Sequence, residues 1–172
     1  MEKVIFLDMD GVLAFGRWVK IDDKTYEAII EETQLQRFAE LIEATKATVI
    51  LSSAWRRCKS DRKQISEALE SVGVAWDPEN RTPDTKNGNR ADEIQAWLDK
   101  HPEVKKFAVL DDDATAAVFG ENYFQTYWPE VSNEEVKADP NWETTFKGRF
   151  EVAGLTTEVV SSVVEHLGGT NE

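Results

Sequence analysis

The composition of this 172-residue chain fits a folded protein with a sizeable core. Hydrophobic residues make up 41% and aromatic residues 10% of it, which excludes an intrinsically disordered chain. The net charge of −13 argues against an extended nucleic-acid-binding surface and against attraction to anionic lipid. One cysteine, Cys58, excludes an internal disulfide framework and a cysteine-rich zinc site. With no membrane-spanning run and no signal-peptide pattern, we expect a single cytoplasmic domain over residues 1–172.

The first predicted element is a short buried strand over residues 4–7. Its four successive apolar residues, Val-Ile-Phe-Leu, are typical of a strand inside a parallel sheet. The strand leads directly to Asp8 and Asp10, and Gly11 then allows the backbone to turn sharply. Burying both carboxylates charged and unpaired would cost several kcal/mol. A divalent cation beside them would remove that cost.

Helical and strand patterns then alternate along the chain. Residues 14–32 are expected to form a loop with a hairpin, and residues 129–148 an exposed excursion. Helical spacing and apolar runs predict helices from Thr33 (as N-cap) and over 61–72, 90–100 and 156–167, and strands over 47–51, 74–76, 104–110, 123–128 and 149–152. This alternation predicts an α/β fold with a parallel sheet and helices on both faces.

Polar residues follow three of the predicted strands. Asp8 and Asp10 follow the first strand, Ser52 and Ser53 the second, and residues 111–113, all aspartate, a later one. Because ligands of parallel α/β sheets bind beyond the carboxyl ends of the strands, we expect these side chains to converge on one edge. Carboxylates without a histidine or cysteine cluster favour a hard cation, and Mg²⁺ prefers such oxygen ligands.

The same residue types fit phosphoryl transfer. A carboxylate such as Asp8 can attack phosphorus and form an aspartyl-phosphate. The second aspartate, Asp10, can protonate the leaving oxygen and later activate water. A serine hydroxyl after the second strand can donate to a phosphoryl oxygen, and a cation such as Arg90 or Lys86 can stabilise the developing charge.

Three segments carry a resemblance to a known family. Residues 6–12, with the sequence FLDMDGV, resemble the first motif of the haloacid dehalogenase (HAD) superfamily. Residues 48–55 resemble its second motif, and residues 109–112, an apolar strand ending in paired aspartates, resemble its fourth. Residues 53–56 and 90–98 look most like the small HAD domains of phage and RNA-repair proteins. The resemblance implies a Rossmann-like three-layer α/β sandwich with a parallel central sheet.

The resemblance also implies roles for the aspartates. By position, Asp8 would be the nucleophile and Asp10 the general acid and base. An aspartate two residues after the nucleophile, where Asp10 stands here, is typical of the superfamily's phosphatases and absent from its dehalogenases. Asp8, the backbone carbonyl of Asp10, and Asp111 or Asp112 would hold Mg²⁺. A different interpretation of the Asp111 cluster is an acidic cap at a helix N-terminus.

Two further motifs leave alternatives open. The third motif of the superfamily is a lysine or arginine before the fourth-motif strand, and Arg90 fits it by local pattern while Lys86 has the commoner residue type. The Ser-x-Trp spacing favours Ser53 over Ser52 as the phosphate-binding hydroxyl. Arg56 either contacts the same phosphate or lies on the solvated surface.

The inserts after the first strand and over residues 74–89 are too short for an independent cap, so we expect a capless or minimally capped site. By resemblance, such open sites often act on macromolecular phosphates. We therefore expect a phosphatase acting on a nucleotide or a nucleic-acid terminal phosphate. A small-metabolite phosphatase and a non-catalytic binding or regulatory module are the alternatives, and the intact aspartates argue against the module.

Trp18 and Trp55 are candidates for stacking on a base, whereas Trp97 is expected in the core.

Overall fold

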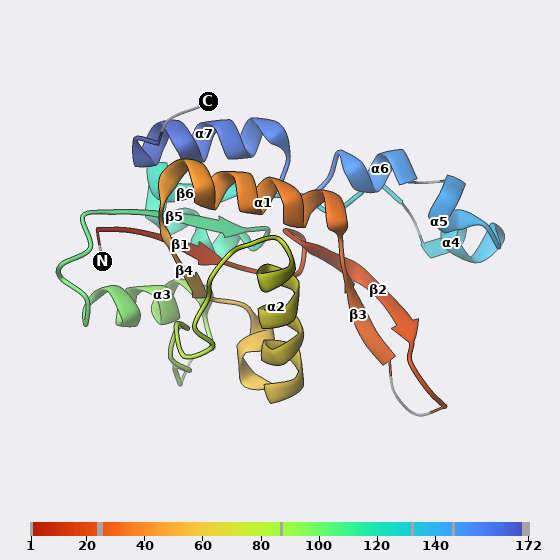
Figure 1. Ribbon diagram of the computed structural model, residues 1–172, viewed down its shortest axis with the longest axis horizontal. Helices are drawn as coiled ribbons and strands as arrows, with labels where there is room; N and C mark the ends of the chain where they lie inside the picture. The colour runs from red at the N-terminus through yellow and green to blue at the C-terminus, as the bar shows by residue number, and fades with distance from the viewer. Residues whose placement is uncertain (1, 24–25, 87, 132, 146, 170–172) are drawn as a thin grey trace.

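The centre of the molecule is a four-stranded parallel sheet with the strand order β4–β1–β5–β6 (Figure 1). β1 (Lys3–Leu7) lies between β4 (Thr48–Leu51) and β5 (Lys106–Asp111), and β6 (Tyr123–Gln125) pairs with β5 at the far edge. This confirms the predicted Rossmann-like α/β architecture. The computed structural model describes residues 2–23, 26–86, 88–131, 133–145 and 147–169.

Helices cover both faces of this sheet. Figure 1 shows α1 (Glu32–Thr45) and α7 (Thr157–Leu167) on one side and α3 (Arg90–Leu98) on the other. Alternate residues of β1 therefore enter different cores: Leu7 packs with α1 and α7, whereas Phe6 packs with α3. The Phe6 ring meets that of Trp97 edge-on, with the centroids 5.3 Å apart. Trp97 is 6% exposed, which confirms its predicted place in the core.

The remaining elements connect these layers. A 3-10 helix, η1 (Ala54–Arg57), follows β4 and leads into α2 (Lys59–Ser71), whose Ile65 and Leu69 join the core of α1 and α7. A second 3-10 helix, η2 (Ala114–Asn122), joins β5 to β6. Among the described residues, no helix has the length and the hydropathy needed to cross a membrane.

The insert after β1 is a hairpin of β2 (Ala14–Lys20) and β3 (Tyr26–Ile30), which extends away from the central sheet (Figure 1). This confirms the hairpin predicted within residues 14–32. At its base Arg17 donates two hydrogen bonds to the Glu31 carboxylate, over 2.8 and 2.7 Å. The pair joins the hairpin to the residue that precedes α1.

The segment predicted as an exposed excursion contains three short helices, α4 (Asn133–Ala138), α5 (Trp142–Thr145) and α6 (Lys147–Glu151). Phe150 of α6 is buried against Phe15 of β2. The strand predicted over residues 149–152 is therefore wrong, because an aromatic anchor and a helical turn occupy that segment.

Two other local predictions are wrong. α1 begins at Glu32 after Glu31 as N-cap, so Thr33 lies inside the helix. The strand predicted over residues 74–76 does not form, because the chain first reaches the free edge of β4 several residues later. There Leu51 donates to the Asn80 carbonyl and accepts from the Thr82 N–H, at 2.9 and 3.0 Å. The other predicted helices and strands form with shifted ends.

Candidate active site

The carboxyl ends of β4, β1 and β5 place Ser52, Asp8 and Asp111 side by side. Leu7 pairs in register with the residues just before Ser52 and Asp111, so the next residue of each strand lies at the same level of the sheet. The backbone pairing continues there, because Asp8 N–H donates to β5 over 3.0 Å and Ser52 N–H donates to Leu7 over 2.8 Å. Each of these residues is at most 4% exposed. The sheet thus brings together residues more than 100 positions apart.

Three carboxylates and one guanidinium meet at this point. One carboxylate oxygen from each of Asp8, Asp111 and Asp112 lies within 4.8 Å of the others. Arg90 Nη2 lies 3.3 Å from Asp8 Oδ1, and its Nε lies 2.8 Å from Asp111 Oδ2. Arg90 therefore offsets part of the negative charge that the strand ends bury.

The position of Arg90 follows from the start of α3. Asn89 is the N-cap, and its side-chain oxygen accepts the Ala91 N–H over 2.8 Å. The helix therefore begins at Arg90, whose side chain reaches across the ends of β1 and β5. Lys86, the alternative cation, is exposed and forms no ion pair within the described part of the chain. Of the two predicted cations, the structure brings Arg90 to the carboxylates.

Asp10 is held by a tryptophan that follows β4. Trp55 Nε1 donates to Asp10 Oδ2 over 2.9 Å. Burial raises the pKa of Asp10 above its ordinary value, the bond from Trp55 opposes this, and the charge of Asp8 adds to the rise. A half-buried carboxyl with a raised pKa is suited to carry a proton for a leaving group. The sequence pattern predicts stacking for Trp55 and no contact with Asp10; the Ser-x-Trp spacing from Ser53 is the one local signal that places Trp55 near the site.

Asp112 has a matching partner in Trp128, whose Nε1 donates to Asp112 Oδ2 over 2.5 Å. Gly11 makes room for this carboxylate. Its φ is +72°, and a Cβ added there would lie 2.6 Å from Asp112 Cγ. Glycine is thus required both by the backbone turn and by the close approach. Trp128 ends the strand predicted over residues 123–128, but β6 ends at Gln125, and no sequence pattern relates the indole beyond it to Asp112.

Asp111 provides the test of whether a metal ion fits here. Its Oδ1 accepts the Asp113 N–H over 2.9 Å, whereas its buried Oδ2 has no aligned hydrogen bond among the described residues despite the nearby Arg90. Burial, and then the charge of Asp8, raise the pKa of Asp111 to about 8. A buried carboxylate oxygen without an aligned donor, beside two more carboxylates, suits an oxygen-preferring cation. The donor set therefore fits Mg²⁺.

The third aspartate of the run has a different place. Asp113 is exposed, and its Oδ1 accepts the Thr115 N–H over 2.8 Å at the start of η2. The capping interpretation therefore describes Asp113. Asp111 and Asp112, by contrast, form the carboxylate cluster with Asp8.

Both candidate serines are fully buried. Ser53 Oγ accepts the Trp55 N–H over 3.4 Å at the start of η1. Ser52 Oγ has no hydrogen-bond partner within the described ranges and lies level with Asp8. Both hydroxyls remain candidates for a phosphate contact. Ser52 is a candidate because it lies level with Asp8 and its hydroxyl has no hydrogen-bond partner among the described residues. Ser53 is a candidate because it lies at the start of η1.

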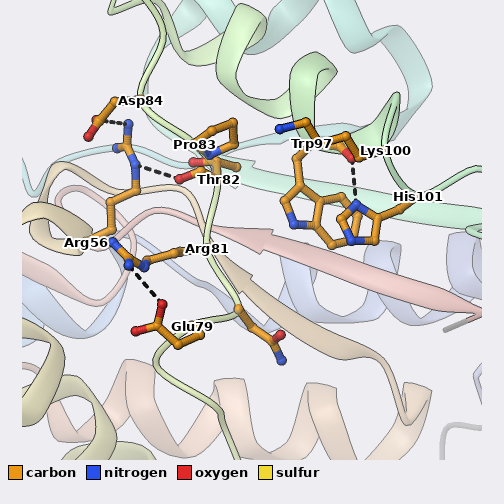
Figure 2. Close-up of a pocket in the computed structure, with 10 residues that line it drawn as sticks. Arg56, Glu79, Arg81, Thr82, Pro83, Asp84, Trp97, Lys100 and His101 are labelled. Carbon is orange, nitrogen blue, oxygen red and sulfur yellow. Dashed lines mark hydrogen bonds and ion pairs between the residues drawn. The ribbon is translucent and has the colours of Figure 1, made fainter.

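Arg56 is not placed to contact a phosphate, contrary to the prediction. Its side chain is 2% exposed. It donates from Nη2 to Glu93 over 2.5 Å and to Asp84 over 2.9 Å, and from Nη1 to the Ser53 carbonyl over 2.8 Å. Figure 2 shows its bonds to Asp84 and to Thr82 at the wall of a cavity of about 410 Å³ that none of the cluster aspartates lines. Arg56 instead joins η1 to α3, which fixes the turn after β4.

The fold and this site define a domain of the HAD superfamily. Comparison with protein families matches residues 4–134 to the family described as the HAD domain in Swiss Army Knife RNA repair proteins. The match includes the aspartate cluster, both serines and Arg90, and the chain belongs to this family. Membership indicates a phosphatase-type hydrolase, and HAD proteins generally use Mg²⁺. Comparison with curated proteins found no match.

Proposed function

We propose that this chain is a magnesium-dependent phosphomonoester hydrolase that forms an aspartyl-phosphate on Asp8. One observation carries the proposal: Asp8 is a buried carboxylate at a strand end, in contact with Arg90 and with Asp111 beside it. Arg90 offsets part of the charge of this carboxylate, which lies at the carboxyl ends of the strands, where ligands of parallel α/β sheets bind. These are the requirements of an in-line nucleophile.

The first half-reaction uses both motif-one aspartates. An Asp8 oxygen attacks phosphorus and forms a new P–O bond, while the bond from phosphorus to the leaving oxygen breaks. Asp10 donates its proton to that oxygen, and the bond from Trp55 Nε1 holds the carboxyl in place for the transfer. The raised pKa of Asp10, caused mainly by burial, favours the protonated form that this step needs.

The second half-reaction reverses the role of Asp10. As a carboxylate it takes a proton from water, whose oxygen attacks phosphorus and displaces Asp8. Free phosphate leaves and both aspartates return to their initial states. Arg90 keeps Asp8 oriented throughout, and a hydroxyl of Ser52 or Ser53 donates to a phosphoryl oxygen.

The metal would be held by Asp8, the backbone carbonyl of Asp10, Asp111 and Asp112. When bound, Mg²⁺ neutralises charge on the phosphoryl oxygens. The oxygen of Asp111 that lacks an aligned hydrogen bond supports this assignment. So does the purely oxygen character of the donor set.

A nucleotide or a nucleic-acid terminal phosphate is the proposed substrate. The family is described from RNA repair proteins, and the insert after β1 is a two-stranded hairpin, which leaves room for the end of a large substrate. The net charge of −13 opposes binding along a polynucleotide. Recognition of an end, however, needs few backbone contacts.

The test is hydrolysis of p-nitrophenyl phosphate with Mg²⁺ by the wild type and by Asp8→Asn. We expect the variant to lose activity while its circular dichroism stays native, and EDTA to abolish wild-type activity. Asp113→Asn is the matched control, because this exposed aspartate caps η2 and we expect near-normal rates. Turnover by Asp8→Asn, or activity insensitive to EDTA, contradicts the mechanism.

A screen of free sugar phosphates and nucleotides against phosphorylated oligonucleotides separates the proposed substrate from a small metabolite. A non-catalytic module becomes the better interpretation if calorimetry shows no Mg²⁺ binding and no phosphoester is hydrolysed.

A further inference from the structure

A small cavity of about 160 Å³ lies between the β2–β3 hairpin and the start of α2. Its aromatic walls are Trp18, Tyr26 and Trp55, and we call it the ring pocket. Trp18 and Tyr26 are 61% and 58% exposed. They lie on one face of the hairpin, because Trp18 pairs with Ala28, two residues from Tyr26. Large aromatic side chains left open beside a cavity indicate a binding surface.

Trp55 joins the ring pocket to the active site. Its indole forms part of the pocket wall, and its Nε1 donates to Asp10 Oδ2 over 2.9 Å. The hairpin is held against α2 by Gln64, whose side-chain amide donates to the Ala28 carbonyl. A group bound in the ring pocket would therefore be separated from the general acid, Asp10, by the Trp55 side chain alone. The hydrogen bond from Gln64 connects the two walls of the pocket, the hairpin and α2.

The size and chemistry of the pocket favour a neutral aromatic ring. A cavity of about 150 Å³ is enough to hold benzene, so this one accepts a planar ring and is too small for a whole nucleotide. Glu27 and Asp61 also contribute to its lining, and none of its lining residues is a lysine or an arginine. This acidic character repels a phosphate, so the pocket suits the neutral ring of a nucleotide better than its charged part.

We propose that the ring pocket binds the base of the nucleotide whose phosphate Asp8 attacks. This inference rests on the proposed function and adds the part of the substrate that is recognised. Stacking on aromatic side chains accepts every base, because each has a π-face. It also needs no positive surface, in keeping with the net charge of −13. Base stacking thus supplies affinity that backbone contacts would supply in a basic protein.

The kinetic test compares nucleoside 3′- and 5′-monophosphates with ribose 5-phosphate, which has no base. For Trp18→Ala we expect the ratio of kcat/KM between the better nucleotide and ribose 5-phosphate to fall about tenfold, mainly through KM. Trp18→Phe retains a ring and should keep most of the ratio. Val118→Ala, at a 74% exposed apolar residue of η2, is the control for lost surface. An unchanged ratio in Trp18→Ala, or an equal fall in Val118→Ala, overturns the proposal.

A binding test separates this inference from the proposed function. Nucleosides without phosphate are titrated against the wild type and Trp18→Ala, and tryptophan fluorescence is recorded. Quenching in the wild type that is much weaker in Trp18→Ala supports the ring pocket, even if no phosphoester is hydrolysed and the proposed function fails. No quenching by any nucleoside overturns the pocket assignment. Preference for phosphotyrosine peptides over nucleotides also overturns it, since the ring would then belong to a protein.

Discussion

Replacing Arg90 by methionine should destabilise the metal-free protein strongly and the magnesium-bound protein much less. Arg90 lies 3.3 Å from Asp8 and 2.8 Å from Asp111, and all three side chains are at most 13% exposed. Removing one partner of a buried ion pair costs about 3–5 kcal/mol, because the remaining charge stays buried without compensation. That is a large part of the 5–15 kcal/mol by which a typical domain is stable.

The assay is urea unfolding in EDTA and in Mg²⁺. At pH 9, above the pKa of about 8 that burial and Asp8 give to Asp111, we expect Arg90→Met to lose about 4 kcal/mol in EDTA. At pH 6 the loss should be smaller, because Asp111 then carries a proton. Mg²⁺ should recover much of the loss at pH 9 by supplying positive charge. Equal losses with and without Mg²⁺, or no loss in EDTA, would refute the view that Arg90 compensates a metal-binding carboxylate cluster.

Three further predictions follow from the same cluster. In EDTA, the free energy of unfolding of the wild type should fall as pH rises from about 4 to 8, because the pKa of Asp111 is raised from 3.8 to about 8 by folding; Mg²⁺ should flatten this dependence in urea titrations. Gly11→Ala should abolish phosphatase activity, because the added methyl group would crowd the Asp112 carboxylate. Gly73→Ala is the control: this glycine also has positive φ, but no atom lies within 4 Å of its Cβ position, so the variant should stay active and lose only about 1–2 kcal/mol of stability. Trp55→Phe should shift the basic limb of the pH dependence of kcat/KM to higher pH, because the hydrogen bond from Trp55 lowers the pKa of Asp10, which must be protonated in the first step.

The partners of the site residues could not be predicted from sequence patterns. Trp55 lies 45 positions from Asp10, and the hydrogen bond between them depends on how η1 leaves β4. Arg56 follows the predicted phosphate-binding segment directly, yet Glu93 of α3 binds its guanidinium inside the protein. Hydrophobic periodicity reports which face of an element is buried. It does not report which polar groups meet across two elements.

The choice between Arg90 and Lys86 was open for the same reason. Both precede the strand that ends in Asp111, and the two sequence signals disagree: the local pattern favours Arg90, whereas the residue type favours Lys86. Arg90 reaches the carboxylates because α3 begins directly after the Asn89 cap and packs against Phe6 of β1.

Sequence patterns alone predict the four strands of the central sheet, the family and the aspartates that follow those strands. These are local properties, since an apolar run followed by Asp8 and Asp10 marks both a buried strand and its carboxyl end. The environment of those aspartates depends on tertiary packing, which brings in the guanidinium of Arg90, the indoles of Trp55 and Trp128, and the ring pocket beside Trp55. Those contacts join residues far apart in the chain, and they exist because helices and a hairpin pack at particular positions against the sheet.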